Sequence, residues 1–426
     1  MTMVYLTIHR SAHTIGGNCI EITTSEGHRL ILDAGRPLDA PVEMTTGLIP
    51  SSLDINTPID GLLLSHSHQD HYGLLNELPI SWPVFCGEPS EKLIRLTASI
   101  FGDPPKQVFR HWQSEIPFTL GPFTITPYLT DHSAFDAYML QVDVHGRRLL
   151  YSGDFRIHGR KQSLVKKMLA NPPKKVDILI MEGTNIGSDK PCLSESDLET
   201  EFTQLLQTTP GRVFVGWSAQ NIDRTVTLFR ACKRTNRTMV VDLYGAEVLE
   251  TLAAHANIPR PGWPNLKVVI TSGLSKIYNK KGQSDFIERM VKQGIAAKRL
   301  CDNKRQWLIM TRSSLIRDYQ RNNVIPTPED VWSWSMWSGY LQEERGQIIQ
   351  SWFEKTECPA KHIHTSGHAS PTDLQEFAEK IAPRFLVPVH GIAWDGENTV
   401  GFPAIQRLAD GEMFSIPTTN SEEGHY

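Results

Sequence analysis

The sequence predicts an α/β protein built in two parts. In the first part, short apolar or alternating runs are separated by glycine- and serine-containing turns, a pattern typical of strands. From about Asn185 the pattern changes to a regular alternation of strands and helices, which favours a parallel sheet. At 426 residues the chain exceeds one typical domain, so two domains are expected.

The first part and the end of the chain predict sheets that pack together under helices. Helical patterns are expected at Leu74–Leu78 and Ser90–Ile100. The expected strands are Val4–Ile8, Cys19–Ile22, Leu30–Leu32, Leu62–Leu64, Pro83–Cys86, Phe123–Tyr128, Tyr138–Val144, Arg148–Ser152, Val176–Met181, His362–His364 and Phe385–Val389. Ser370 followed by Pro371 predicts the start of a further helix. The polar tail from Thr418 is expected to be disordered.

The middle part predicts a parallel α/β unit. Its expected strands are Arg212–Trp217, Thr238–Leu243, Leu266–Thr271, Trp307–Thr311 and Val331–Ser335. Its expected helices are Asp223–Cys232, Ala246–Ala254 and Glu343–Thr356.

Composition narrows the class of protein. The 43 Lys and Arg residues against 47 Asp and Glu give a net charge of −4, so no global positive field marks a nucleic-acid partner. Six scattered cysteines without a C-x-x-C pair argue against a disulfide framework and fit a reducing compartment. Neither a signal peptide nor a membrane-spanning apolar run is visible. We therefore expect a cytoplasmic protein without membrane contact.

A cluster of potential metal ligands follows the apolar run Leu62–Leu64. His66, His68, Asp70 and His71 fall within six positions. Because side chains alternate along a strand, the first two histidines are expected on the same side, and the other pair follows where the chain turns. Imidazole and carboxylate together suit zinc, or a harder metal such as manganese. The pattern predicts a metal site.

Three further candidate ligands follow later strands. They are His132 in T-D-H-S, Asp154 in S-G-D-F and His390 in P-V-H-G. Each alone would more often be an ordinary loop residue, but their number and order favour a site with two metals.

These motifs resemble those of metallo-β-lactamase-fold hydrolases. Glu182 in M-E-G-T-N, His368 in S-G-H-A-S and His390 in P-V-H-G are similar to the three further motifs of the β-CASP branch, on its ribonuclease J side. The resemblance implies a metallo-β-lactamase αββα sandwich formed by residues 1–184 and 357–417. A parallel β-CASP domain is expected as an insertion over residues 185–356, and a tail over 418–426.

The resemblance also implies roles for individual residues. His66, His68 and His132 would hold one divalent ion, Asp70, His71 and His390 would hold a second, and Asp154 would bridge them. Zinc is the expected metal, with manganese as the alternative. Asp33 would orient a ligand histidine through its ring N–H, or else only cap a turn.

A proton donor is expected beside the metals. His368 would protonate the leaving oxygen or contact the phosphate, while Glu182 would raise its pKa. Asp70 is counted with these two as a catalytic residue. The alternative is that His368 only caps the helix beginning near Ser370.

Substrate contacts are predicted in the middle part. W-S-A-Q-N-I-D-R resembles a β-CASP segment that faces the substrate backbone, so Ser218, Asn221 and Arg224 are expected to contact phosphates. The alternative is an ordinary capped helix. Ribonuclease J enzymes usually accept a 5′-phosphate on a Gly/Ser-rich loop, where this chain has M-T-R-S-S-L, so Arg312 is the expected clamp. Ser366, near His368, completes the predicted substrate-binding set.

The tryptophans in V-W-S-W-S-M-W leave two interpretations open. Trp332, Trp334 and Trp337 could stack bases, although the first two, at strand spacing, are more often core residues. The basic stretches Lys161–Lys175 and Lys298–Arg305 are more often solvated faces than nucleic-acid tracks.

The sequence and its resemblance predict a metal-dependent nuclease. It would hydrolyse phosphodiester bonds of RNA, or of single-stranded DNA, through a hydroxide activated by two metals. One alternative is a phosphodiesterase for a small nucleotide or other small phosphodiester. The other is a catalytically reduced scaffold component.

Overall fold

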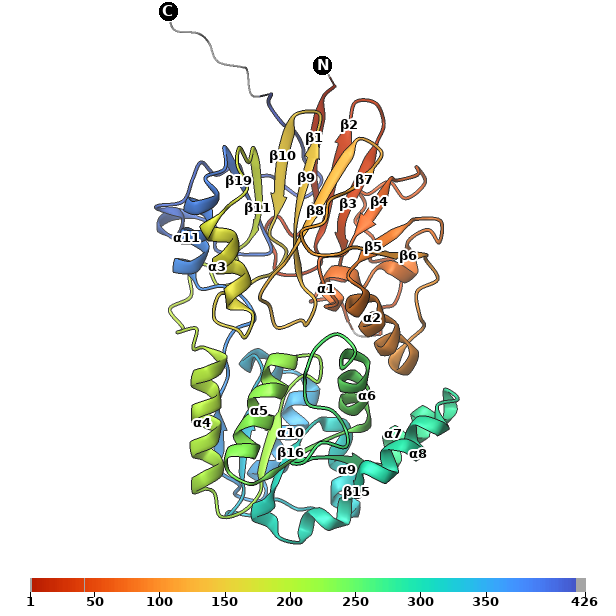
Figure 1. Cartoon of the computed structure of the whole chain (residues 1–426), viewed down its shortest axis with the longest axis vertical. Coiled ribbons are helices and arrows are strands. Elements are labelled where there is room, and N and C mark those ends of the chain that lie inside the picture. Colours follow the sequence, from red (N-terminus) through yellow and green to blue (C-terminus); the bar gives the residue numbers. More distant parts are fainter. Residues whose placement is uncertain (1, 42, 419–426) are drawn as a thin grey trace, which may run out of the picture. The chain divides into compact units, whose positions relative to one another are not determined.

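The computed structural model describes residues 2–41 and 43–418, and it contains two compact units (Figure 1). Unit 1 comprises Met1–Ala98, Asp103–Lys190 and Gly367–Tyr426. Unit 2 comprises Ser99–Gly102 and Pro191–Ser366. Beyond residue 418, the tail that the sequence predicts as disordered lies outside the described residues.

Unit 1 contains two sheets. The first has the order β20-β1-β2-β3-β4-β5-β6, antiparallel from β20 to β3 and parallel from β3 to β6. Its strands are β1 Val4–Arg10, β2 Cys19–Thr24, β3 Arg29–Ala34, β4 Gly61–Leu63, β5 Val84–Cys86, β6 Phe109–His111 and β20 Met413–Ser415.

The second sheet has the order β19-β11-β10-β9-β8-β7. Its strands are β7 Phe118–Leu120, β8 Phe123–Leu129, β9 Tyr138–Val144, β10 Arg147–Tyr151, β11 Ile178–Glu182 and β19 Phe385–Val389. β10, β11 and β19 run parallel, so the carboxyl ends of these three strands share one edge. Because β19 and β20 come from the end of the chain, both ends of the sequence build this unit.

Side-chain alternation explains the layers of unit 1. Along β11, Ile178 and Ile180 face the core between the two sheets, whereas Leu179 and Met181 face the opposite way. There they meet apolar side chains of two helices, α3 Gln162–Ala170 and α11 Pro371–Ile381. The other helical elements of the unit are α1 Gln69–Tyr72, η1 Leu75–Glu77, η5 Gly396–Thr399 and, as far as Ala98, α2 Glu88–Phe101. The αββα arrangement that the resemblance implies is confirmed (Figure 1).

Unit 2 is built on a parallel sheet of order β15-β14-β13-β16-β12-β17-β18. Its strands are β12 Val213–Gly216, β13 Thr238–Val241, β14 Leu266–Ile270, β15 Gly294–Ala296, β16 Trp307–Met310, β17 Val331–Trp334 and β18 Ala360–His362. Its helical elements are α4 Glu195–Thr208, α5 Ile222–Arg234, α6 Leu243–Leu252, α7 Ser272–Lys280, α8 Ser284–Gln293, η2 Ala297–Cys301, η3 Lys304–Gln306, α9 Ser313–Arg321, η4 Ser338–Leu341 and α10 Glu344–Glu354. The parallel α/β organisation expected from the sequence is confirmed.

Helix starts follow the capping rules. The predicted start at Ser370 is confirmed, because its side chain accepts from the Asp373 N–H, the Asp373 side chain returns the bond, and Pro371 occupies the first turn. α3, α4, α7, α8 and α9 are absent from the expected helices. α7 and α8 each bury only two apolar side chains one turn apart, which is too short a pattern to identify a helix from sequence.

The predicted strand before the histidine cluster ends earlier than expected. β4 stops at Leu63, so His66 and His68 lie in the loop that precedes α1. The argument from strand alternation was therefore wrong for these two residues. Asp70 and His71 lie on the single helical turn α1, which follows β4 as the expected change of chain direction.

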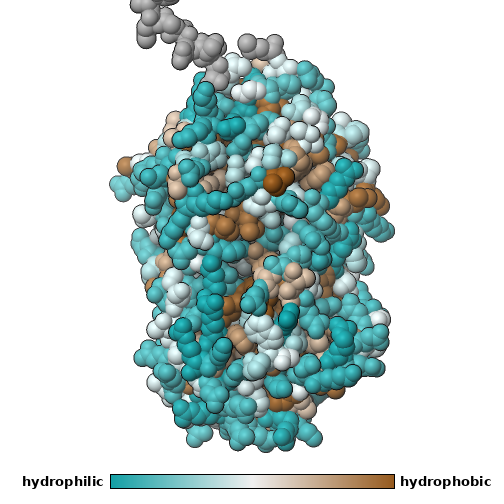
Figure 2. Space-filling view, in the orientation of Figure 1, coloured by the Kyte–Doolittle hydropathy of each residue, from teal (hydrophilic) through white to brown (hydrophobic). Residues whose placement is uncertain are grey.

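The described surface carries no sign of a membrane span. Figure 2 shows a face on which hydrophilic side chains dominate and apolar ones form small separate groups. Among the described residues, no helix combines the length and the apolar character needed to cross a bilayer.

A buried ion pair should contribute to the stability of unit 2. The Arg212 and Asp330 side chains lie 2.7 Å apart at 1% and 0% exposure. Arg212→Ala should lower the free energy of unfolding by about 3–5 kcal/mol, because the buried carboxylate loses its partner. Urea unfolding at neutral pH measures this change. Arg230→Ala, which removes a side chain that is 55% exposed, is the control and should cost under about 1 kcal/mol. Equal losses in the two variants would contradict the prediction.

Candidate metal centre

Strand ends of unit 1 bring the predicted site residues together. Asp154 and His390 follow β10 and β19, and Glu182 is the last residue of β11, so neighbouring parallel strands deliver all three to one edge. The other members of the set come from the β4–α1 loop, α1, the segment after β8 and the segment before α11. All nine predicted ligand, Glu and His residues belong to unit 1.

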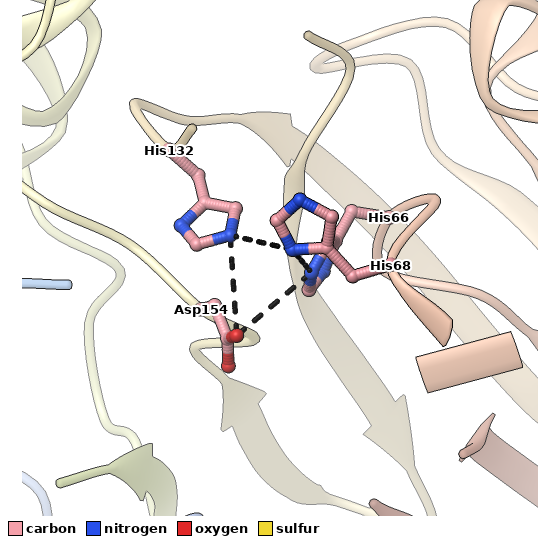
Figure 3. A group of neighbouring side chains, drawn as sticks. All are labelled: His66, His68, His132 and Asp154. Carbon is pink, nitrogen blue, oxygen red and sulfur yellow. Dashed lines mark hydrogen bonds and ion pairs between the residues drawn. The ribbon is translucent and has the colours of Figure 1, made fainter. Parts of the chain in front are cut away.

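The first group consists of three imidazoles and a carboxylate that point toward one another (Figure 3). His68 Nδ1 lies 3.1 Å from His66 Nε2 and 3.2 Å from His132 Nε2. Asp154 Oδ2 lies 3.8 Å from His66 Nε2 and 4.0 Å from His132 Nε2. The four ligand atoms all lie within 4.8 Å of one another, a spacing that can surround one ion.

The second group shares Asp154 with the first. It adds Asp70, His71 and His390, again with ligand atoms within 4.8 Å of one another. His71 Nε2 lies 3.1 Å from Asp154 Oδ2, and Asp70 Oδ2 lies 3.8 Å from both His71 Nε2 and His390 Nε2. A carboxylate common to two such groups is placed to bridge two ions.

Burial leaves most of these imidazoles neutral, the form that donates a lone pair to a metal. It lowers the pKa of His68 to about 4, and it lowers the pKa values of His66 and His132 well below their ordinary value. The pKa of His390 is also lowered by burial. His71 is the exception, since Asp154 and Asp33 overcome burial and raise its pKa well above the usual range.

The donor set fits divalent ions. Asp154 is 2% exposed, and its Oδ1 is buried without a hydrogen bond in the structure. Such an oxygen is costly unless a cation or donor satisfies it. Burial disfavours the charged carboxylate, but His390 and His71 overcome it and hold the pKa of Asp154 well below its ordinary value. Imidazole nitrogens around an ionised carboxylate suit zinc, and also manganese.

Asp33 lies behind the second group. It occupies the left-handed region at φ 59°, and its Oδ2 accepts from His71 Nδ1 at 2.7 Å. Ser65 donates its N–H and its hydroxyl to the same carboxylate, at 2.7 Å each. This geometry fits the predicted orienting role, because it leaves His71 Nε2 for a metal.

Glu182 and His368 form a third group with Asp154. Glu182 is 1% exposed, and its Oε2 lies 2.8 Å from His368 Nδ1. Burial lowers the pKa of His368, but Glu182 and Asp154 outweigh it and raise that pKa to about 9. His368 also lies 3.8 Å from Asp154, close to the bridging position.

The predicted substrate residues all belong to unit 2, and the prediction for Arg224 was wrong. Arg224 is fully buried, where it bonds Glu195 and the carbonyl of Ser335, so its guanidinium cannot reach a phosphate in solvent. Asn221 accepts from the Arg224 N–H and caps α5. The remaining three differ in exposure, with Ser218 exposed and both Arg312 and Ser366 partly buried.

Two of the three tryptophans are core residues. Trp332 and Trp334 are 6% and 4% exposed, and Trp332 stacks on Phe353 at a centroid distance of 4.9 Å. The faces of these two rings are therefore too buried to stack on a nucleobase. Trp337, in contrast, is 58% exposed.

Sequence reasoning missed several residues beside the site. Asn18 lies 2.8 Å from His390, and Tyr151 donates to Asp33 at 2.7 Å. Asn185 donates to the carbonyls of His368 and Ala369. The sequence predicts no role for Asn18 and places Tyr151 only in a strand, because no local pattern marks a contact formed across the fold.

The first part of the chain matches a known protein family. The Metallo-beta-lactamase superfamily matches residues 14–169, which include His66, His132 and Asp154.

Curated relatives match over most of the chain. "Ribonuclease J" of Helicobacter pylori (strain ATCC 700392 / 26695) is 23% identical over 400 residues, covering 88% of this chain and 54% of the relative. "Ribonuclease J" of Sinorhizobium meliloti is 21% identical, covering 92% and 70%. "Ribonuclease J 2" of Streptococcus pyogenes serotype M3 is 24% identical, covering 85% and 65%. The chain thus spans about half the length of the Helicobacter relative.

A solved structure shares the fold. The crystal structure of a protein of unknown function from Enterococcus faecalis V583 superposes with a TM-score of 0.76 at 19% identity. The match covers 97% of this chain and all of the other.

Removing the shared carboxylate should abolish tight metal binding. Asp154→Asn should weaken Zn²⁺ binding by more than about 100-fold, because changes to residues behind metal ligands already cost about 10–100-fold. Equilibrium dialysis with metal analysis measures the bound ions. The control is Asp143→Asn on β9, whose carboxylate bonds Arg148 and Gln141 and belongs to neither ligand group. Wild-type zinc content in Asp154→Asn would contradict the shared role.

Glu182→Gln should lower the pKa of His368 in protein freed of divalent ions. Burial, which lowers the pKa of His368, would then be opposed mainly by Asp154 and no longer by the charge of Glu182. The pKa should therefore fall from about 9 toward or below 6.5. The amide oxygen can still accept from the Phe155 N–H. A raised histidine pKa stabilises the fold at low pH, and this contribution is lost as the pH rises through about 9. NMR titration of the imidazole measures the shift, with Glu199→Gln as the control. An unchanged pKa would show that Glu182 does not control His368.

Proposed function

We propose that the chain is a metal-dependent ribonuclease of the metallo-beta-lactamase superfamily, in its ribonuclease J-like β-CASP branch. The single observation that carries the proposal is the position of Asp154, whose carboxylate belongs to both four-residue ligand groups. The names of the curated relatives favour RNA over DNA as substrate.

Two divalent ions in these groups, zinc before manganese, would supply Lewis acidity toward a phosphodiester and promote ionisation of a water. The protein residues hold the ligand atoms in place before substrate arrives. Preformed charge stabilisation of this kind avoids reorganisation during reaction. Hydrolysis would leave 5′-phosphate and 3′-hydroxyl ends.

His368 is proposed as the proton donor to the leaving oxygen. With its pKa raised to about 9, the ring stays protonated at neutral pH and can donate through Nε2 while Nδ1 holds Glu182. Asp70, at 14% side-chain exposure, is the most accessible carboxylate of the two ligand groups and would help to orient the attacking water.

Substrate contacts are proposed at two helix starts of unit 2. Ser218 is exposed just before α5, and Arg312 lies at the N-terminus of α9 with 23% of its side chain exposed. Helix N-termini and arginine both favour phosphate. Asn221 and Ser366 stay in the proposed set, and Arg224 does not.

The proposal extends to the compartment. The structure pairs none of the described cysteines in a disulfide bond, which fits the reducing cytoplasm.

A substrate panel tests the proposed function. Purified protein with Zn²⁺ or Mn²⁺ is incubated with labelled RNA and DNA that carry 5′-phosphate, 5′-triphosphate or 5′-hydroxyl ends. We expect metal-dependent cleavage of RNA, and its loss in His68→Ala and Asp70→Ala because each removes a ligand. His28→Ala, which changes a half-exposed surface histidine, should keep full activity.

Other outcomes separate the alternatives. No cleavage by the metal-loaded wild type, or cleavage that survives both ligand variants, would overturn the proposal. Cleavage of bis(p-nitrophenyl) phosphate without action on polymers would favour the small-phosphodiester alternative. Equal rates on the three 5′ ends would exclude a 5′-exonuclease.

A further inference from the structure

A chain of hydrogen bonds joins His390 to His71 through three intervening side chains. Asn18 Oδ1 lies 2.8 Å from His390 Nδ1, and Asn18 Nδ2 donates to the Tyr151 hydroxyl at 2.8 Å. Tyr151 in turn donates to Asp33 Oδ2 at 2.7 Å, and the same oxygen accepts from His71 Nδ1 at 2.7 Å. The path connects residues from both ends of the sequence.

The carboxylate of Asp33 fixes which group donates and which accepts in every hydrogen bond of this path. Asp33 only accepts, so both Tyr151 and His71 must donate to it. The Tyr151 oxygen then accepts from the Asn18 amide, which leaves Asn18 Oδ1 to accept from the His390 Nδ1–H. Asn18, Tyr151 and Asp33 are 1%, 0% and 0% exposed, so bulk water does not compete for these bonds.

We propose that Asn18 and Tyr151 are positioning residues that hold His71 and His390 as a matched pair of metal ligands. With Nδ1 of each ring engaged as a donor, Nε2 of each is left for a metal. The two rings stack with centroids 5.3 Å apart and an interplanar angle of 21°. Asp70 Oδ2 lies 3.8 Å from both Nε2 atoms, so the arrangement converges on one place.

The backbone of Asn18 reaches the third ligand of this group. Its N–H donates to the Asp70 carbonyl at 3.0 Å, and its own carbonyl accepts from Gly35 at 2.8 Å. A Cβ on Gly35 would lie 1.7 Å from the Asp70 carbonyl oxygen, so only glycine allows this close approach. Asn18 therefore orders Asp70 directly, His390 through its side chain, and His71 through Tyr151 and Asp33.

The first ligand group meets this hydrogen-bond chain at Asp33, through the Ser65 hydroxyl, and its described bonds do not involve Asn18 or Tyr151. His132 Nδ1 is held by the Gly367 carbonyl at 2.7 Å, and His66 Nδ1 lies 3.1 Å from the Ser65 hydroxyl. Loss of the Tyr151 hydroxyl or the Asn18 amide should therefore weaken the second ion and leave the first bound. The inference rests on the metal-binding part of the proposed function and on none of its nucleic-acid chemistry.

Zinc titration against a chromophoric chelator tests the inference without any substrate. Wild-type protein should bind two ions in two resolvable steps, and His390→Ala identifies the step that belongs to the second group. Tyr151→Phe should weaken that step by about 10–100-fold, the usual effect of losing a partner behind a metal ligand. The other step should keep its wild-type constant. Tyr319→Phe, which deletes another buried hydroxyl bonded to a carbonyl at 2.8 Å, is the matched control and should change neither step.

A double variant tests whether Asn18 and Tyr151 act through one hydrogen-bonded path or whether each substitution disturbs the fold independently. Asn18→Ala should weaken the same step, and Asn18→Ala with Tyr151→Phe should weaken it by less than the product of the two single effects, since both break one path. Metal-free thermal unfolding of each variant checks that the fold persists.

Three results would overturn the inference: equal weakening of both steps, no weakening of either, or wild-type binding of fewer than two ions. If two ions bind as described and RNA is not cleaved, the proposed ribonuclease function is refuted while the positioning role stands. The positioning role can also fail alone, if RNA is cleaved and Tyr151→Phe titrates like the wild type.

Discussion

The buried carboxylate of Asp154 is the interaction on which the rest of the site depends. Six imidazoles and two further carboxylates surround the Asp154 carboxylate, and Asp154 is only 2% exposed. Groups of this kind are costly to bury unless they are paired or coordinate a cation. The shifted pKa values reflect that cost. Burial keeps His66, His68 and His132 neutral, while His71 and His368 gain protons beside the negative charge. Neutral imidazoles beside an ionised carboxylate are the forms of these side chains that ligate divalent ions.

Holding such groups together requires a rigid frame, and the second sheet supplies it. β10, β11 and β19 are parallel neighbours, so Asp154, Glu182 and His390 emerge from one edge. This geometry requires backbone strain at two residues. Asp33 and His390 occupy the left-handed region, at φ 59° and 50°. At His390 the backbone N–H donates to the Ser11 carbonyl at 2.8 Å, and this bond stabilises the strained conformation.

In unit 2, a charged residue of a motif that resembles a family's substrate-facing segment has a structural role. Arg224 lies in a segment that suggests phosphate contact, yet Glu195 and Ser335 hold it inside the unit. Its burial makes it a structural link between the start of α4, α5 and the segment after β17. Arg312, by contrast, stays partly exposed beside Asp242 and over the ring of Tyr244, so only this arginine keeps a surface role open.

Residue identity and order alone were enough to predict the α/β class, the parallel sheet of unit 2 and the set of candidate ligands, because strand ends and metal-binding side chains leave local patterns. The loop position of His66 and His68, the helices α7 and α8, and the burial of Arg224 were decided only in the tertiary structure. So were Asn18 and Tyr151, whose partners lie 372 and 118 positions away. A contact between residues so distant in the sequence forms only when separate strands pack, and no local spacing encodes it.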